Sequence, residues 1–497
     1  MKRNALSLII LILPLFLCAQ NWEVDFGEPY KKRHKTGWGG DAESSRFLGL
    51  DKQHYFLNHK SKRENEILQF DFEHNLVNVF PIGENFKGKE FEAENILKMN
   101  KRKYLISSYL NRKKKYIYAT RLNNDGSLGE VKEPLFSYLP SRSNSGSLNT
   151  DARGFSISPD SSKIVFAMVG DYESRSYEGN EVYQIFVFDN QLNKLWEKEV
   201  LLPNLDKKIQ VHEFRVNDIG DVILVAKHKF KRNNSCIPKG DFFILRVKEE
   251  AENILNTLRL KNSYPISITT FFDNDILYVA GIYTDGMKER SGADGTFMMK
   301  FDDDDELSFY KKYPFEEKIK KYLIPNRQKR GSENFFNFEI DDLLIDYRNG
   351  YFLFVAENRY VANIGVIYTA EDIIVSKFTF EGKLEWNFHK DKKSFGSSAI
   401  YGLSHGNGNI YLIYNARKTT KERKQIQHKR RPNWSSTYTD VIKINDKGKI
   451  EFEETIFHSR ELKIPISPRF SRKINSKNIL LFFHDQSNFR YGTLKFR

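Results

Sequence analysis

The chain has 497 residues, of which 40% are hydrophobic, and a formal net charge of +14, so it contains enough apolar material for a large core and is not intrinsically disordered. Its two cysteines exclude a disulfide-stapled mini-protein and a cysteine-rich zinc or iron–sulfur protein. A mean hydropathy of −0.58 excludes a polytopic membrane protein.

Residues 1–19 have the pattern of a secretory signal peptide. Lys2 and Arg3 provide its positive charge, and an apolar run of about 12 residues follows, which is too short to span a bilayer. We expect cleavage after Ala19, which lowers the net charge from +14 by the two charges of Lys2 and Arg3 to +12. No later stretch reaches 18 apolar residues, so we expect no transmembrane segment once the signal is removed.

The alternative to plain secretion is a lipid anchor on Cys18. Bacterial lipoproteins carry a small residue before that cysteine, whereas this chain has Leu17 there. The sequence therefore favours export to the periplasm, the cell surface or the medium over lipoprotein anchoring. Removal of the signal leaves Cys236 alone, so the mature chain has no intramolecular disulfide and depends on core burial for stability.

One pattern recurs along the chain: a β-rich run ends in a hydrophobic anchor residue, a polar turn follows, and a short aromatic or aliphatic strand comes next. Clear copies cover residues 185–200, 298–312, 375–388 and 441–454, and weaker copies cover 67–80, 118–131 and 244–258. The anchors recur about every 61 residues, within or just above the range of repeat architectures. They are Phe70, Leu122, Phe188, Val247, Phe301, Phe378, Ile444 and Phe496.

A second short strand precedes each anchor, and an irregular first strand lies upstream of it. The second strands are expected at 55–57, 104–106, 164–167, 222–225, 276–279, 351–354, 410–413 and 479–482. Four strands per unit are typical of a propeller blade. The last unit lacks its fourth strand, and residues 21–28 are similar to the fourth strands of other units. The sequence thus predicts an all-β fold in which residues 20–497 form a single β-propeller. It has about eight four-stranded blades, with seven as the alternative count, and the N-terminal strand closes the ring by completing the last blade.

Several units resemble known propeller repeats, and together they span nearly all of the mature chain. Residues 155–167 resemble the TolB/WD40-like repeat, in which a Ser-Pro-Asp turn leads into the second strand. Residues 188–200 and 378–388 are similar to quinoprotein-like repeats, in which a Trp-bearing strand follows a turn. The resemblance implies the fold but no specific functional family, because propellers host many unrelated activities. The chain lacks the vicinal cysteines of many quinone-dependent dehydrogenases, so we expect no cofactor.

Loop length and charge are both distributed unevenly. In a propeller the A–B and C–D turns lie on one face and the B–C and D–A connections lie on the other. The first set is short here, whereas the second contains the long segments 28–45, 137–153, 170–182, 228–240, 283–296, 314–335, 358–372 and 415–438. Binding residues commonly lie in such loops, and most of these segments are basic. The candidate ligand-binding residues are Arg33, Trp38, Lys231, Arg232, Arg327, Arg330, Arg423, Arg430, Arg431 and Trp434.

Signals for catalysis or metal binding are weak. The sequence contains no HxH, HExxH or Gly-x-Ser-x-Gly motif and no phosphate-binding glycine-rich loop. The acidic run 302–306 is expected to be a solvated turn, because it lacks the alternating spacing of a calcium loop. The histidines in or beside predicted strands are expected to be structural; they are His212, His228, His405 and His484. We assign no catalytic, cofactor-binding or metal-binding residue.

The leading hypothesis is an exported, non-catalytic, monomeric binding or scaffold protein that contacts a cell-envelope protein or an anionic glycan through its long loops. The alternative is an extracellular polysaccharide hydrolase or lyase whose carboxylates converge from several blades at the channel mouth. A third interpretation of the basic loops is that they are merely solvated. A nucleic-acid partner is not expected, since the chain is exported and carries no recognition motif.

Overall fold

The computed structural model of the chain describes residues 22–496, apart from several connections between strands. The main gaps are 32–43, 61–64, 83–90, 140–153, 171–181, 202–208, 229–241, 286–292, 324–337, 362–367, 396–400, 417–437 and 459–465, with shorter gaps of one to three residues elsewhere. The predicted signal peptide, Cys18 and Cys236 therefore lie outside the described residues.

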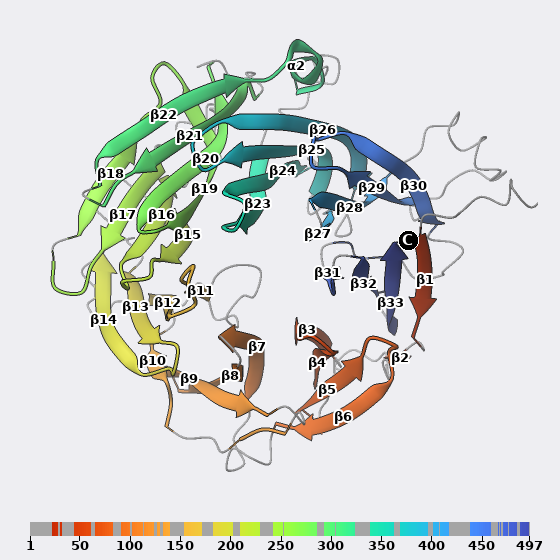
Figure 1. Ribbon diagram of the computed structural model, residues 1–497. Helices are drawn as coiled ribbons and strands as arrows, with labels where there is room; N and C mark the ends of the chain where they lie inside the picture. Colours follow the sequence, from red (N-terminus) through yellow and green to blue (C-terminus); the bar gives the residue numbers. More distant parts are fainter. Residues whose placement is uncertain are drawn as a thin grey trace, which may run out of the picture.

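Eight antiparallel sheets form a closed ring around a central axis (Figure 1), which confirms the predicted eight-bladed propeller. Blade 1 consists of β3 (Ser44–Leu50), β4 (His54–Lys60), β5 (Asn65–Asp71) and β6 (Leu76–Pro81), and blade 2 of β7 (Glu92–Met99), β8 (Arg102–Asn111), β9 (Lys114–Leu122) and β10 (Phe136–Tyr138). Blade 3 consists of β11 (Phe155–Ile157), β12 (Lys163–Gly170), β13 (Val182–Asp189) and β14 (Lys194–Leu201), and blade 4 of β15 (Ile209–Val216), β16 (Val222–His228), β17 (Phe242–Val247) and β18 (Ile254–Leu258).

Blade 5 consists of β19 (Tyr264–Asp273), β20 (Ile276–Thr284), β21 (Gly295–Phe301) and β22 (Leu307–Pro314), and blade 6 of β23 (Phe338–Asp346), β24 (Tyr351–Val361), β25 (Tyr368–Thr379) and β26 (Leu384–Phe395). Blade 7 consists of β27 (Gly402–Gly406), β28 (Asn409–Ala416), β29 (Tyr438–Ile444) and β30 (Ile450–His458). Blade 8 consists of β31 (Arg472–Lys473), β32 (Asn478–His484) and β33 (Asn488–Phe496), and β1 (Trp22–Phe26) is its fourth strand. Within each blade the first strand, A, lies nearest the axis and the fourth, D, lies outermost (Figure 1).

The burial of each strand follows from its place in the blade. A middle strand packs against neighbouring blades on both faces, so all six residues of β17 are buried, and its sequence is nearly continuously apolar. An outer strand such as β14 alternates between exposed and covered side chains. All eight predicted anchors are buried at or next to the ends of the third strands, and all eight predicted second strands lie in the observed B strands.

The N-terminal strand closes the ring as predicted. β1 pairs antiparallel with β33, from Trp22 opposite Phe496 to Phe26 opposite Gly492. The short strand β2 (Tyr30–Lys31) extends this pairing along β33, and Lys495 forms an ion pair with Asp25. The first and last strands of the chain therefore complete one sheet, and the outer edge of β33 is covered.

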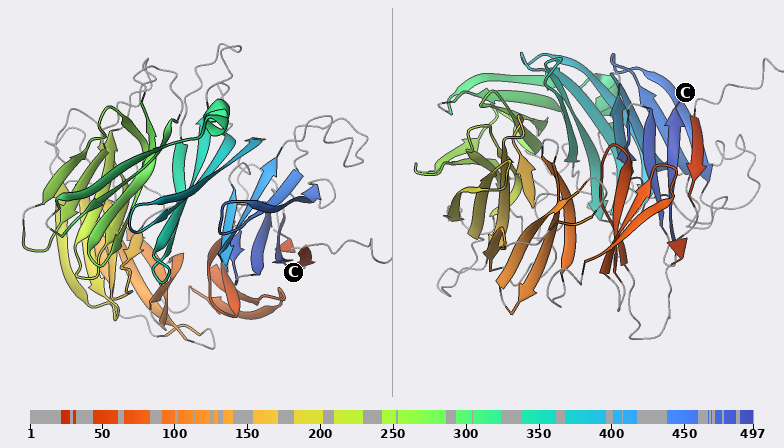
Figure 2. Two further views of the ribbon diagram at one scale, coloured as in Figure 1. Left: turned by 45° about the horizontal axis from the view of Figure 1, so that its top comes forward. Right: turned by 60° about the horizontal axis from the view of Figure 1, so that its bottom comes forward.

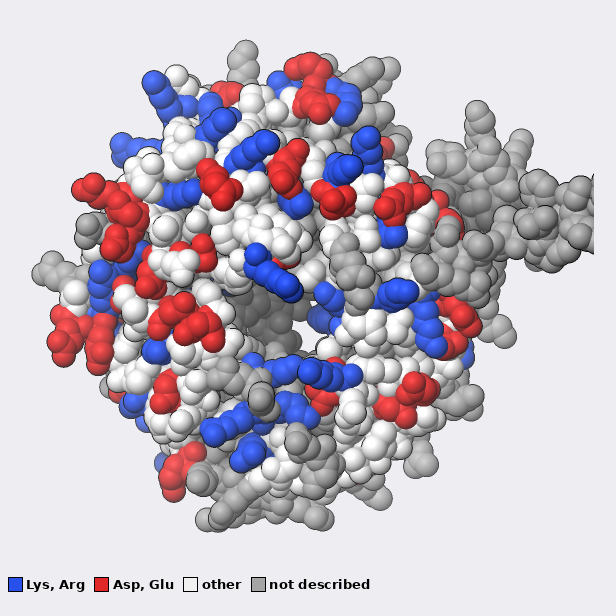
Figure 3. Space-filling view, in the orientation of Figure 1, with Lys and Arg blue, Asp and Glu red and all other residues white. Residues whose placement is uncertain are grey.

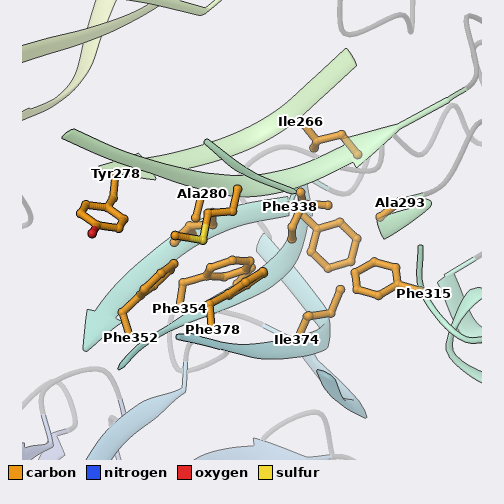
Figure 4. Packing of buried hydrophobic residues seen from close by; sticks show 14 of the residues in the cluster. Ile266, Tyr278, Ala280, Ala293, Phe315, Phe338, Phe352, Phe354, Ile374 and Phe378 are labelled. Carbon is orange, nitrogen blue, oxygen red and sulfur yellow. The ribbon is translucent and has the colours of Figure 1, made fainter. Parts of the chain in front are cut away.

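A separate apolar cluster fills each of the eight interfaces between neighbouring blades. Figure 4 shows the cluster between blades 5 and 6, in which the Phe352 and Phe378 rings stack with their centroids 5.3 Å apart. The cluster between blades 8 and 1 is the smallest and contains six buried residues, among them Tyr55 and Tyr491. This seam between blades 8 and 1 thus has the fewest buried apolar residues of the eight interfaces, counted over the described residues.

A hydrogen-bonded histidine supplements that seam. His74, in the turn between β5 and β6, has its Nδ1 3.1 Å from the Tyr55 hydroxyl and its Nε2 3.2 Å from Thr493 Oγ1 on β33. The Thr493 hydroxyl donates to the Phe72 carbonyl, so its oxygen can accept from His74 Nε2–H while Tyr55 donates to Nδ1. Burial lowers the pKa of His74 to about 4, so the ring is neutral at pH 7.

Aromatic side chains of outer strands dock onto glycine turns of the next blade. Trp386 on β26 donates from Nε1 to the Asp446 carbonyl at 2.8 Å, and its ring lies against Gly448, where an added Cβ would come within 2.6 Å. Phe309 on β22 lies in the same way against Gly382. Both glycines have positive φ, so close approach and backbone geometry both favour glycine there.

Two expectations need correction. The fourth strand of blade 2 was predicted directly after the turn at 124–126, but Leu128 forms only an isolated bridge, and the strand is β10 at Phe136–Tyr138. The segment 314–335 was predicted to be a loop, but it begins with the short helix α2 (Glu317–Leu323). Ile319 and Leu323 on this helix are buried in the cluster between blades 5 and 6, which explains why it forms.

Candidate functional site

The ten candidate ligand-binding residues all lie in connections outside the described residues, so the structure neither brings them together nor separates them. The strands to which these connections attach are described. Because A, B, C and D alternate in direction, every B–C and D–A connection leaves from one end of its blade, which we call the long-loop face. The A–B and C–D turns form the short-turn face. The two views in Figure 2 show the strands running between these faces.

Buried ion pairs lie near the long-loop end of two blades. In blade 2, Lys115 Nζ is 3.0 Å from Glu94 Oε1, which also accepts from the Ser108 hydroxyl. In blade 6, Lys392 pairs with Glu357, and both side chains are fully buried. Charges in such surroundings require their partners, so these pairs fix the strand ends that support the long loops.

Polar side chains also fasten the connections on this face. Asn65 donates to the Phe91 carbonyl across the connection from blade 1 to blade 2. Asn415 donates to the Ile466 carbonyl at 3.0 Å and accepts from the Thr439 hydroxyl, which links β28, β29 and the connection from blade 7 to blade 8. The long-loop face therefore has a rigid polar base.

A histidine–carboxylate pair occurs in the same region. His389 Nε2 lies 2.8 Å from Asp372 Oδ1, and both side chains are about nine-tenths buried. They belong to β26 and β25, the two outer strands of blade 6, and not to the inner strands that line the axis. This position differs from the axial opening at which the enzyme hypothesis places its acids.

Part of the expected positive charge is neutralised locally. In the described part of segment 314–335, Lys318 lies 2.6 Å from Glu316 and Lys320 lies 3.1 Å from Glu317. The sequence analysis counted both lysines toward the positive charge of this segment. The structure shows that a glutamate two or three positions earlier in the chain forms an ion pair with each of them.

The acidic run 302–306 is the C–D turn between β21 and β22, as expected, but it is not wholly solvated. The Asp305 carboxylate is buried and lies 2.8 Å from Arg246 Nε, which ties the turn to blade 4. Asp302 Oδ1 accepts from the Glu306 amide and so stabilises the turn. Among the residues that the structure describes, no group of three or more potential ligands could hold a metal ion.

The four highlighted histidines have different surroundings. His212 makes an edge-to-face contact with Phe242, as expected of a structural residue. The side chains of His228 and His484 lie outside the described residues. His405 lies on the inner strand β27, where partial burial of its ring and then the nearby Lys473 lower its pKa. Its expected structural role stays a prediction.

The short-turn face has a carboxyl pair in neighbouring A–B turns. Asp218 Oδ1 accepts from the Asp160 amide at 3.0 Å, and Asp160 Oδ1 accepts from the Ser158 hydroxyl and the Ser162 amide. Burial raises the pKa of Asp160, but these hydrogen bonds outweigh it and hold the value at about 2, whereas burial raises the pKa of Asp218. Both carboxylates thus serve to build their turns.

Basic side chains gather around the axial opening on the short-turn face, which is the face seen in Figure 3. We define the opening's rim as the A–B turns together with the two flanking residues of each strand. Six rim cations make no ion pair among the described residues; they are Lys52, Lys98, Arg102, Arg348, Lys473 and Lys477. Sequence analysis missed them because each turn contributes only one or two. They lie at different positions around the A–B turns of blades 6, 8, 1 and 2, so no single repeat position marks them.

Comparisons with known proteins assign the chain to no family. No protein-family model and no curated protein matches the chain. Among solved structures, the WD40 domain of SCAP from fission yeast matches with a TM-score of 0.40 and 8% identity, over 96% of this chain and 98% of that one. The polysaccharide lyase Uly1 matches with a TM-score of 0.38 and 10% identity, over 91% and 99%. A prolyl endopeptidase matches with a TM-score of 0.39 and 10% identity, over 89% of this chain and 54% of that one.

The chain is an eight-bladed β-propeller by its own sheet topology. None of the helices in the described part of the chain has the length and apolar character needed to cross a membrane.

Proposed function

We propose that the protein is an exported, non-catalytic binding or scaffold propeller that engages a cell-envelope protein or an anionic glycan through its long-loop face. The observation that carries this proposal is the common origin of the long connections. β28 ends at Ala416 and β29 begins at Tyr438, and the intervening segment contains Arg423, Arg430 and Arg431. The other basic connections leave from the same end of their blades, and the proposal is that their charges act together there.

The interpretation as a binding protein is favoured over the enzyme alternative by what the described carboxylates do. Asp160 and Asp218 stabilise turns, Glu94 and Glu357 are neutralised by buried lysines, and Asp372 is paired in the outer strands. Each of these acids has a structural partner.

The test compares two triple variants for retention on immobilised polygalacturonate. Arg423→Ala/Arg430→Ala/Arg431→Ala should elute at clearly lower salt than the wild type, since screening weakens exposed charge interactions steeply between 0.05 and about 0.2 M salt. The matched control, Lys383→Ala/Lys447→Ala/Lys449→Ala, removes three exposed charges from C–D turns of the opposite face. Equal elution of the two variants would contradict the proposal.

Export is tested separately. The protein should be recovered outside the cytoplasm with an N-terminus at or near Gln20, and replacement of Lys2 and Arg3 by acidic residues should reduce its export. Recovery of the full-length chain in the cytoplasm would contradict the predicted signal peptide.

A further inference from the structure

We propose that the axial opening on the short-turn face is a second binding site and that its ligand is an acidic polysaccharide. This site lies on the face opposite the long loops, so the inference does not depend on the proposed function. It is built entirely from described residues, and three features support it.

The first feature is an uneven distribution of charge around the rim. Among the described residues, the rim of blades 6, 7, 8, 1 and 2 contains eight Lys or Arg residues against two Asp; these are Lys52, Lys98, Arg102, Lys103, Arg348, Arg472, Lys473 and Lys477 against Asp51 and Asp346. In blades 3, 4 and 5 it contains two cations against five acids; these are Lys163 and Arg215 against Asp160, Asp218, Asp221, Asp273 and Asp275. One arc of the opening attracts a polyanion and the other repels it.

The second feature is that the two acids of the basic arc already have hydrogen-bond or ion-pair partners, whereas most cations of that arc make no ion pair among the described residues. Asp51 accepts from Lys103 at 2.7 Å, and Asp346 accepts from both the amide and the side chain of Asn349. Arg215 on the acidic arc pairs with Glu213. The six cations named above make no such pair among the described residues. The charge that a ligand meets is therefore more positive than the residue count suggests.

Lys473 on β31 and His405 on β27 interact where blades 7 and 8 meet. Lys473 is half-buried and pairs with no carboxylate of the described residues, and loss of hydration lowers its pKa. The same lysine opposes protonation of His405 on β27, while Asp346 on β23 favours it. Arg472 is held in place with its guanidinium over the Phe47 ring at 5.6 Å. A ligand anion here replaces lost hydration and relieves repulsion between like charges.

The third feature identifies the ligand class. Tyr347 precedes Arg348 at the boundary between the two arcs, and the residue is 42% exposed. Its side chain extends toward the acidic arc, where burial and then Asp273 and Asp218 raise its pKa. Its hydroxyl donates to the Phe272 carbonyl at 3.0 Å, and its ring meets Phe380 edge-on at 6.1 Å, so the exposed ring is immobilised. A fixed aromatic face beside separate single charges suits a sugar ring bearing carboxylates. A protein partner would call for several apolar anchors, and within the described part of the basic arc Tyr347 is the exposed large hydrophobic residue.

The test measures binding of the full-length mature protein to polygalacturonate, to poly-glutamate and to neutral dextran by calorimetry at low salt. The rim variant is Lys52→Glu/Lys98→Glu/Arg102→Glu. Its matched control is Lys383→Glu/Lys447→Glu/Lys449→Glu, which makes the same charge change at outer turns of the same face. We expect the rim variant to bind polygalacturonate at least about tenfold more weakly, and the control to stay within about twofold of wild type.

A second pair of variants tests the aromatic platform. Tyr347→Ala should weaken polygalacturonate binding about fivefold and leave poly-glutamate binding unchanged, while Tyr347→Phe, which keeps the ring, should bind as wild type does. Thermal unfolding of every variant verifies that the fold is retained.

Three outcomes would overturn the inference. Equal losses in the rim variant and its control would mean that only net charge matters. Poly-glutamate binding as tight as polygalacturonate binding, and insensitive to Tyr347→Ala, would remove the glycan class. Unchanged polygalacturonate binding by the rim variant, with loss in the Arg423/Arg430/Arg431 variant, would refute this site and leave the long-loop proposal intact.

Discussion

His74 makes the seam between blades 8 and 1 sensitive to acid. The neutral ring accepts from Tyr55 at Nδ1 and donates toward Thr493 at Nε2, so protonation removes the acceptor of the Tyr55 hydroxyl. Burial is the main cause of the low pKa; Arg490 and Lys495 reinforce it, while Asp71 and Asp25 oppose it. An unfolded histidine binds a proton near pH 6.5, whereas the native one does so only near pH 4, so this contribution to stability is lost as the pH falls between those values.

The size of the stability loss follows from how far the pKa of His74 lies below that of an unfolded histidine. One pKa unit corresponds to about 1.4 kcal/mol, so the change from 6.5 to about 4 sets an upper limit of about 3 kcal/mol on the loss at pH 4. Water screens part of this energy because the side chain is only partly buried, so we expect a loss of about 2 kcal/mol.

Urea unfolding at pH 7.5 and pH 4.0, followed by tryptophan fluorescence, measures this loss in the wild type and in His74→Asn. Asparagine tolerates the left-handed backbone at position 74, where φ is 69°, and does not titrate. The variant should be less stable at pH 7.5, but it should lose about 2 kcal/mol less than the wild type on acidification. Parallel losses in the two proteins would refute this account of His74.

Three further predictions concern the scaffold. Lys392→Met leaves the buried Glu357 carboxylate without its ammonium partner and should cost about 3–5 kcal/mol in urea unfolding, with Lys392→Arg costing less. Gly448→Ala should lower the melting temperature more than Gly350→Ala, because both have positive φ but only the first places a methyl group against Trp386. Deletion of β1 should cause aggregation through the exposed edge of β33, and a peptide of residues 21–28 added in trans should suppress it.

These predictions fail in distinct ways. Equal stability of Lys392→Met and wild type would mean that Glu357 is neutralised by another group. Equal melting temperatures of the two alanine variants would mean that the docking of Trp386 adds nothing to the backbone strain. A soluble, cooperative protein without β1 would show that closure of the ring is dispensable.

The fold could be predicted from sequence because a propeller repeats one unit. Anchors such as Phe188 and Ile444 recur at the ends of buried third strands, and a regular signal seen eight times outweighs irregularity in any single copy. The prediction failed where a blade departs from its repeat. The D strand of blade 2 begins only at Phe136 because residues 123–135 intervene, and a short helix forms at 317–323 because Ile319 and Leu323 face a neighbouring core.

The site was harder to predict because charge in a sequence does not show which partner each group has. Lys318 looked like a free loop cation but pairs with Glu316, and Asp305 looked solvated but is buried against Arg246. His74 gave no sequence signal, since its partners Tyr55 and Thr493 lie 19 and 419 residues away. Contacts of that separation follow from the closed ring and not from local sequence.

The register of β1 on β33 also determines how the ring responds to mechanical force. Trp22 lies opposite Phe496, so the outgoing chain ends emerge at the same end of the strand pair. Tension applied through the two ends therefore peels β1 away one rung at a time, instead of shearing all its hydrogen bonds together. A ring held only by its ends would open at low force and could close again when the tension is released, with each of the other seven blades left intact.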